Sequence, residues 1–174
     1  MLYENKFYRS ENERLKKLID ESNIYSKEFL LSKVLMDQQS PYLKSVIINK
    51  GFNHGIKLGV AVKEKSYFVG KIINVNFLTS RILLASDLNS KIPVIIEPNG
   101  INAILSGQGH NDFAGIEFLP KLKKIKEGDV VYTSGVDGII SQAIPIGKVI
   151  EKDEIFLVEF FVDFNQLKYV KVNK

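Results

Sequence analysis

The sequence predicts a mainly β protein whose strands follow one N-terminal α-helical arm. Two observations predict this fold class. Residues 1–29 contain no Pro or Gly and are dominated by Glu, Lys, Arg and Leu, which favours a helix. After about residue 30 the chain changes to short runs rich in β-branched and aromatic residues, separated by Gly, Asn and Pro. That texture is typical of strands joined by turns.

Composition limits the classes of protein that remain. With 174 residues, 45% hydrophobic and 25% charged, the chain is a globular domain or a domain plus an arm. It has no Cys, which excludes disulfides and thiolate metal sites. The net charge is +4, but Arg supplies only three of the 24 basic residues, and Arg dominates base and phosphate recognition. We therefore expect no nucleic-acid partner.

The arm, residues 1–30, carries a seven-residue hydrophobic repeat. One column contains Met1, Tyr8, Leu15, Ser22 and Phe29, of which four are apolar. This column predicts a coiled-coil seam and a homodimer. The companion column has two phases, one with Leu18 and Tyr25 and one with Ile19, and both stay open. The candidate dimerisation residues are Tyr8, Leu15, Leu18, Ile19, Tyr25 and Phe29. The alternative is a lone amphipathic helix that lies on its own body.

The body is expected to contain about a dozen short strands and a single helical turn near residues 87–90. The predicted strands are 31–37, 43–49, 61–63, 67–75, 81–85, 91–96, 101–105, 113–118, 130–133, 145–151, 155–162 and 167–172. Hardly any helical pattern lies among them. This favours a sandwich or a barrel, with two small barrels as one form, over a parallel α/β fold.

Catalytic and metal-binding patterns are weak. His54 and His110 both lie in Gly- and Asn-rich stretches without metal-ligand spacing, so no metal site is expected. The order His54, Asp87, Ser134 matches the triad order of two-barrel serine proteases. A chymotrypsin-like serine hydrolase, active or degenerate, is therefore the alternative function. Ser134 lacks the Gly-Asp-Ser-Gly-Gly setting of such a nucleophile, and we predict that the protein is not an enzyme.

Cofactor and anion sites are not indicated either. The glycines in 107–109 and 135–138 lack the spacing of a dinucleotide or Walker loop, and turns explain them. We expect no cofactor. The basic run 121–126 is interpreted as a solvated loop. The aromatic segment 159–164 is interpreted as a buried strand, or as a partner site wherever it is exposed.

A resemblance to a known family rests on several sequence blocks. Residues 128–139, GDVVYTSGVDGI, and 144–149, IPIGKV, closely resemble the β region of the rod shape-determining MreC family, which carries a GD-x-V-x-TSG-x-x-G-hydrophobic motif. The blocks 49–62, 69–72, 80–94 and 103–107 follow the family order. One block departs from the family: 140–143 reads ISQA where Phe-Pro-x-Gly is usual. We expect that loop to differ.

The motif residues are predicted to serve folding rather than chemistry. They comprise a hairpin turn, two hydroxyls that bond backbone at a strand exit, two glycines that permit a bend, and the start of the next strand. These residues are Gly128, Asp129, Thr133, Ser134, Gly135, Gly138, Pro145 and Gly147.

The resemblance completes the predicted organisation and function. We predict two small β-barrel-like subdomains, about 45–110 and 111–174, with strand 31–37 contributing, behind the coiled-coil arm. It implies a periplasmic scaffold of the bacterial cell-elongation complex that dimerises, possesses no catalytic activity, and binds and activates the elongation class B penicillin-binding protein. It also implies contact with MreD and MreB at the inner membrane, and an anchor upstream of this soluble part. Filament formation is a further expectation, and we expect the partner to contact the first subdomain, between 46 and 105.

Overall fold

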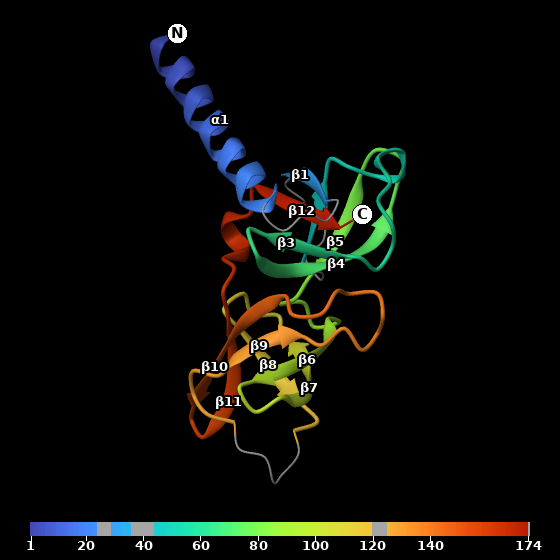
Figure 1. The fold of residues 1–174 in the computed structure, drawn as a ribbon, viewed down its shortest axis with the longest axis vertical. Coiled ribbons are helices and arrows are strands. Elements are labelled where there is room, and N and C mark those ends of the chain that lie inside the picture. Colours follow the sequence, from blue (N-terminus) through green and yellow to red (C-terminus); the bar gives the residue numbers. More distant parts are fainter. Residues whose placement is uncertain (24–28, 36–43, 120–124, 174) are drawn as a thin grey trace.

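A helix projects from two stacked β-barrels (Figure 1). The computed structural model describes residues 1–23, 29–35, 44–119 and 125–173. The helix, α1, spans Leu2–Asn23, so it ends before the predicted limit of residue 29. Phe29 begins the first strand instead. No helix in the described ranges has both the length and the apolar character needed to cross a bilayer.

The first barrel contains six antiparallel strands in the closed order β1-β12-β3-β4-β5-β2. Closure leaves no free strand edge. The strands are β1 (Phe29–Leu35), β2 (Ser45–Ile48), β3 (Ala61–Glu64), β4 (Tyr67–Val75), β5 (Ser80–Leu84) and β12 (Tyr169–Asn173).

The second barrel closes in the order β10-β11-β8-β7-β6-β9. Its strands are β6 (Lys91–Glu97), β7 (Ile101–Gly107), β8 (Phe113–Glu117), β9 (Val130–Thr133), β10 (Pro145–Lys152) and β11 (Ile155–Phe160). The predicted fold class is confirmed, and each predicted strand overlaps an observed one. Two short 3-10 helices, η1 (Phe52–His54) and η2 (Phe164–Gln166), were not predicted.

The strand pairing divides the body differently from the predicted split at about residue 110. β6 and β7 pair with β9 and β8, so they belong to the second barrel. β12 pairs with β1 and β3, so the chain returns to the first barrel. The predicted boundaries were wrong because the hydrophobic pattern of a strand shows its buried face but not its partner.

The buried apolar residues of the two barrels form one continuous cluster. In β6 the buried residues alternate with more exposed ones, which is the period of two expected of a strand with one inward face. The fully buried side chains of the second barrel include Ile92, Val94 and Ile96, and those of the first include Phe68 and Ile82. Burial of these large side chains is the main stabilising contribution of both barrels.

The two barrels contact each other. The ring centroids of Tyr67 in β4 and Phe161 after β11 lie 5.1 Å apart. A Cβ atom built on Gly59 would lie 3.0 Å from Cγ2 of Ile139, so the 134–143 loop of the second barrel packs on the first.

Asp87, between β5 and β6, is buried. The predicted helical turn near residues 87–90 is replaced there by hydrogen-bonded turns.

Candidate interaction surfaces

The GD turn of the predicted motif lies immediately before β9 and is hydrogen-bonded to β10. The Gly128 amide donates to the Val149 carbonyl at 2.8 Å, and the Val149 amide donates to the Asp129 carbonyl at 2.7 Å. The Asp129 carboxylate accepts from the Lys126 amide at 3.0 Å. Gly128 has a φ of +94°, which glycine adopts without steric cost. The turn therefore sets the register of β9 against β10.

Thr133 organises the exit of β9. Its side chain is fully buried. The Oγ1 hydroxyl donates to the Ser141 carbonyl at 2.7 Å and accepts from the Ile144 amide at 3.0 Å. One side chain thus satisfies the Ser141 carbonyl within the 134–143 loop and the Ile144 amide that directly follows the loop.

The loop itself contains three positive φ angles. Gly135 and Gly138 both have φ +73°, and the Ser134 hydroxyl accepts from the Val136 amide at 3.4 Å. Ala143 has φ +67°, and it occupies the place where the family pattern has Gly. The chain therefore takes a left-handed conformation at residue 143 although its side chain disfavours it.

The end of the motif begins β10. Pro145 is the first residue of that strand, where no ladder amide is required. Gly147 lies against β11: a Cβ atom there would be 2.2 Å from the Glu159 carbonyl oxygen. Any side chain at 147 would have to move the backbone of β11, so the glycine is a packing requirement.

The triad candidates bond to backbone rather than to one another. His54 Nδ1 accepts from the Gly51 amide at 3.1 Å. The Asp87 carboxylate accepts from the amides of Lys44 at 2.6 Å and Asn89 at 2.7 Å. His54 thus bonds within its own turn, and Asp87 bonds both within its own turn and to the distant backbone of Lys44. Within the described ranges, no cluster of three His, Cys, Asp or Glu side chains could hold a metal ion.

The arm residues have different surroundings along α1. Tyr8 is 60% exposed, whereas Leu15 is partly buried. The side chains of Leu18, Ile19 and Tyr25 lie outside the described set. Phe29 is not a seam residue, because it belongs to β1 and pairs in register with Asn173. The seven-residue count failed there because it continued past the end of the helix.

A charged cavity of about 470 Å³ separates α1 from the first barrel. The arm contributes Glu11, Arg14 and Lys17, and the barrel contributes Glu64, Lys65, Gln166, Lys168 and Tyr169. The hydroxyl of Tyr169 hydrogen-bonds to the Glu11 carboxylate, and this bond, with burial, raises the pKa of Tyr169. Burial raises the pKa of Glu64, and the nearby Lys65 opposes this shift.

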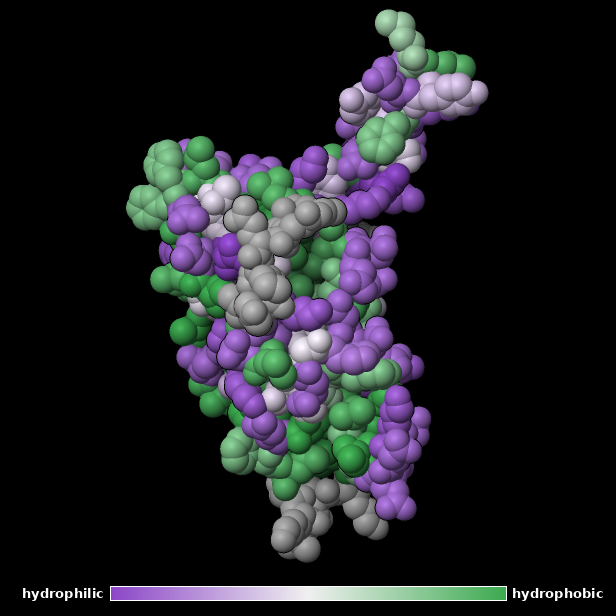
Figure 2. All heavy atoms as spheres, turned by 180° about the vertical axis from the view of Figure 1, so that it is seen from behind, coloured by the Kyte–Doolittle hydropathy of each residue, from purple (hydrophilic) through white to green (hydrophobic). Residues whose placement is uncertain are grey.

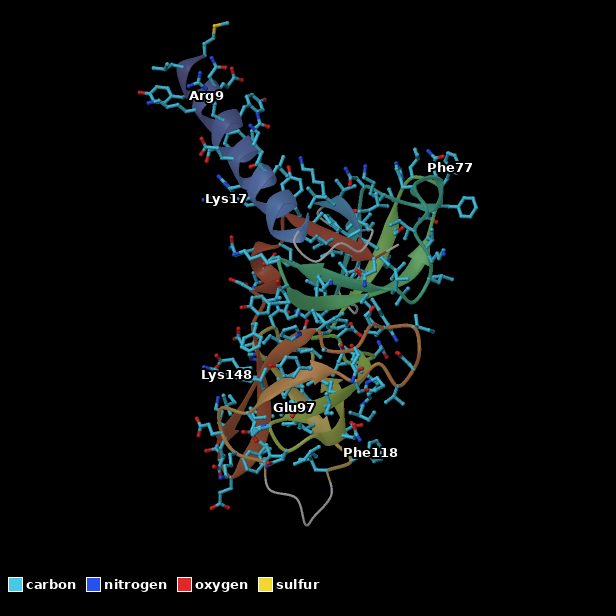
Figure 3. The ribbon with its side chains drawn as sticks, in the orientation of Figure 1. Arg9, Lys17, Phe77, Glu97, Phe118 and Lys148 are labelled. Atoms are coloured by element: carbon cyan, nitrogen blue, oxygen red, sulfur yellow. The ribbon has the colours of Figure 1, made fainter. Side chains whose placement is uncertain are left out.

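An exposed apolar surface lies on the first barrel, away from α1. We name Phe52, Leu58, Phe77 and Leu78 the rim patch; their side chains are 73%, 63%, 63% and 57% exposed. Figure 3 shows Phe77 directed away from the barrel, and Figure 2 shows hydrophobic side chains gathered at that corner.

A groove of about 490 Å³ adjoins the rim patch. Its lining residues are Phe52, Ile56, Lys57, Leu58, Val75, Asn76 and Phe77. The patch lies in the region where we expected a partner, but its residues were not singled out from the sequence. The available signal was the placement of large apolar residues within Gly- and Asn-rich turns, where no core needs them.

Comparison with known proteins identifies the family. The family profile described as "Rod shape-determining protein MreC, barrel core" matches residues 34–174. The chain belongs to the MreC family. Cell shape-determining protein MreC of Cereibacter sphaeroides is 35% identical over 140 residues, covering 80% of this chain and 46% of that protein. The Escherichia coli MreC is 32% identical over 142 residues, covering 82% of this chain and 39% of that protein. The chain thus spans less than half the length of these MreC proteins.

Solved MreC structures share the architecture. One structure described as MreC superimposes with a TM-score of 0.84 at 26% identity, covering 96% of this chain and 99% of that chain. MreC from Pseudomonas aeruginosa gives a TM-score of 0.77 at 26% identity, covering 85% and 100%. A complex between penicillin-binding protein PBP2 and MreC from Helicobacter pylori gives 0.60 at 16% identity, covering 84% and 99%. That last likeness shows a common fold.

Proposed function

We propose that this protein is a non-enzymatic scaffold that maintains rod cell shape by binding a class B penicillin-binding protein on the periplasmic side of the inner membrane. The rim patch is the observation that carries the proposal. It supplies an exposed apolar surface on a fold shared with an MreC that forms a complex with PBP2. The two closed barrels provide a rigid support for that surface.

The rim patch has the properties of a protein-binding centre. Aromatic side chains are enriched at the energetic centres of interfaces, and Phe52 and Phe77 line one groove together with Leu58. Full burial of one such side chain contributes about 1.5–3 kcal/mol. Lys57 at the same groove adds a positive charge that favours a partner surface with a carboxylate.

Activation of the partner requires only that the scaffold bind one partner conformation more tightly than another. A ligand shifts a conformational equilibrium by its difference in affinity for the two states. No chemical step by this chain is needed. The serine hydrolase alternative is not favoured, because the side-chain bonds described for His54, Asp87 and Ser134 are to backbone amides and none of these bonds joins two of the three residues. Labelling of Ser134 by a fluorophosphonate probe would favour the serine hydrolase function instead.

The binding experiment compares two exposed apolar positions. We expect Phe77→Asp to weaken binding to the purified class B enzyme by about tenfold or more, as measured by biolayer interferometry. Ile155→Asp is the matched control, because Ile155 is 61% exposed and lies on the second barrel. A loss of binding in the Ile155 variant alone would place the partner on the second barrel and contradict the proposal.

The further partners follow from the same family relationship. We propose a homodimer through the arm, its extension into filaments, and contact with MreD and MreB through a membrane anchor upstream of this region. The exposed aromatic residues of α1 support pairing. Removal of residues 1–28 is expected to give a monomer at micromolar concentration in sedimentation velocity. A truncated chain that still forms dimers would assign self-association to the barrels.

A further inference from the structure

One face of α1 is apolar along the described part of the arm. Tyr3, Phe7, Glu11 and Leu15 follow one another at intervals of four residues, so they form a stripe on one side of the helix. Tyr8 lies beside this stripe, seven residues before Leu15. Glu11 is the single charged member of the stripe. We call this surface the arm face.

The two ends of the arm face have different surroundings. Tyr3 is 82% exposed and Phe7 60% exposed. Among side chains 1–17, only Glu11 and Leu15 are partly buried. Figure 1 shows the C-terminal end of α1 against β12 and its N-terminal end away from both barrels. The base of the arm face therefore lies beside the protein's own first barrel, with Glu11 lining the cavity between them, while the tip is open.

The base of the arm face makes one specific contact with the first barrel. Glu11 on the arm and Tyr169 in β12 line the same cavity, and the Tyr169 hydroxyl bonds to the Glu11 carboxylate. Arg14 contacts Glu11 from the arm itself, with Nη1 and Oε2 3.8 Å apart. Tyr169 thus supplies the link from the barrel to the one charged residue of the arm face.

We propose that docking of the arm on its own barrel and pairing of the arm with that of a second copy compete for the arm face. The inference rests on the proposed dimer through the arm. The open part of the face, up to Ser10, is about 15 Å long at 1.5 Å per residue. A helix pair of under two heptads is too short to be stable alone. A stable pair must extend past Glu11 to Leu15, and a second helix on that side of the arm requires the link between Glu11 and Tyr169 to break.

Competition predicts the sign of a substitution effect. Tyr169→Phe keeps the ring but removes the hydroxyl that contacts Glu11, so the docked state becomes less populated. Apparent affinity rises with the population of the competent state, and both arms of a dimer must be released. We expect the dimer dissociation constant to fall by about threefold or more. A purely structural role for Tyr169 would leave association unchanged or weaken it.

The test uses the whole chain with two independent measurements. Sedimentation equilibrium gives the dissociation constant for wild type, Tyr169→Phe and the control Tyr132→Phe, which changes a tyrosine of β9 in the second barrel. Pulsed electron–electron double resonance measures the distance distribution between spin labels attached at Asn5→Cys and Lys57→Cys, and so reports docking directly. Only these two sites are labelled, because the chain has no native Cys. At concentrations where the protein is monomeric, Tyr169→Phe should broaden the distance distribution, and Tyr132→Phe should not.

The outcomes separate this proposal from the one on which it rests. Tighter association together with a broader distribution supports competition. A broader distribution with unchanged or weaker association overturns it, because release of the arm then gives no gain in pairing. An unchanged distribution overturns the docking role of Tyr169. Absence of dimers in all variants at every concentration would instead contradict the proposed dimer, and competition with it, while a broader distribution would still show docking.

Discussion

Thr133 and Ser141 connect the two sides of one loop. The Thr133 hydroxyl donates to the Ser141 carbonyl at 2.7 Å, and the same oxygen accepts from the Ile144 amide at 3.0 Å. The TSG part of the family motif therefore shapes a loop that reaches the first barrel, where Ile139 packs on Gly59. We propose that the TSG residues serve folding, so that their substitution changes the free energy of unfolding.

Thr133→Val tests this role. Valine has a similar shape, but it leaves the Ser141 carbonyl and the Ile144 amide without their partner. We expect the free energy of unfolding to fall by about 2–4 kcal/mol, measured by urea denaturation. The neighbouring Ser134→Ala is the control, because its long 3.4 Å bond predicts a change below about 0.5 kcal/mol. Equal effects of the two substitutions would refute the assignment.

Ala143→Gly should stabilise the protein. Ala143 is exposed and has φ +67°, a conformation that costs a non-glycine residue about 1–2 kcal/mol. The greater freedom of glycine in the unfolded chain offsets part of this gain. We expect a net increase of about 0.5–1 kcal/mol, seen as a higher Tm by calorimetry.

The matched control for Ala143→Gly is a substitution that is expected to lower stability. Ala114→Gly, in the buried part of β8, removes a packed methyl group and adds freedom to the unfolded chain. It should lower the Tm. If Ala143→Gly also lowered the Tm, the left-handed conformation at residue 143 would not be a source of strain.

Gly147→Ala should be much more damaging than Gly128→Ala. A methyl group at 147 would lie 2.2 Å from the Glu159 carbonyl oxygen, so β10 and β11 must separate. We expect a loss of about 3 kcal/mol or more. At Gly128 the space is open and only the φ of +94° opposes a side chain, at a cost of about 1 kcal/mol. Chemical denaturation of both variants gives the comparison, and the reverse order would contradict the close packing of β10 on β11.

Glu64→Gln tests the charged cavity through pH. Because burial raises the folded-state pKa of Glu64 above 4.5, protonation favours the folded state. This stabilisation is complete below the unfolded pKa and is lost as pH rises through the folded pKa. Glu64→Gln should therefore match wild type at pH 4 and be slightly more stable at pH 7.5.

The size of the Glu64 effect is limited by exposure. Glu64 is partly exposed, so after solvent screening the gain should stay below about 0.5 kcal/mol. Glu127→Gln, in an exposed turn, is the control for removal of one negative charge. Urea denaturation at pH 4 and pH 7.5 gives the free energies of unfolding of wild type and of both Gln variants for this comparison. A Gln variant less stable than wild type at pH 7.5 would show that Lys65 outweighs burial.

The strands were predictable because each barrel wall has one apolar face. The run 67–75 matches β4 and 130–133 matches β9 without any change of boundary. The assignment of strands to barrels was not predictable, because β12 joins the first barrel through pairing over a long stretch of sequence. Pairing of distant strands depends on tertiary contacts that no local pattern contains.

The motif residues could be singled out from the sequence, whereas the residues of the interaction surfaces could not. Gly128 and Thr133 were singled out by the family motif, and their proposed roles rest on turn and hydroxyl chemistry that acts between near neighbours in sequence. Phe52 and Phe77 were missed, because they gather only when η1 bonds to the turn that follows β4. The contact between Glu11 and Tyr169 joins the start of the chain to its last described strand, and neither residue is unusual by itself.

The place of β12 in the first barrel has a consequence for biosynthesis. A ribosome produces all of the second barrel, residues 91–160, as one uninterrupted stretch, which can fold as it emerges. The first barrel, which carries the rim patch, cannot close until residues 169–173 have been synthesised. Until then its apolar interior is open to chaperones and proteases, so translation that stops early would yield a complete second barrel attached to an incomplete first barrel.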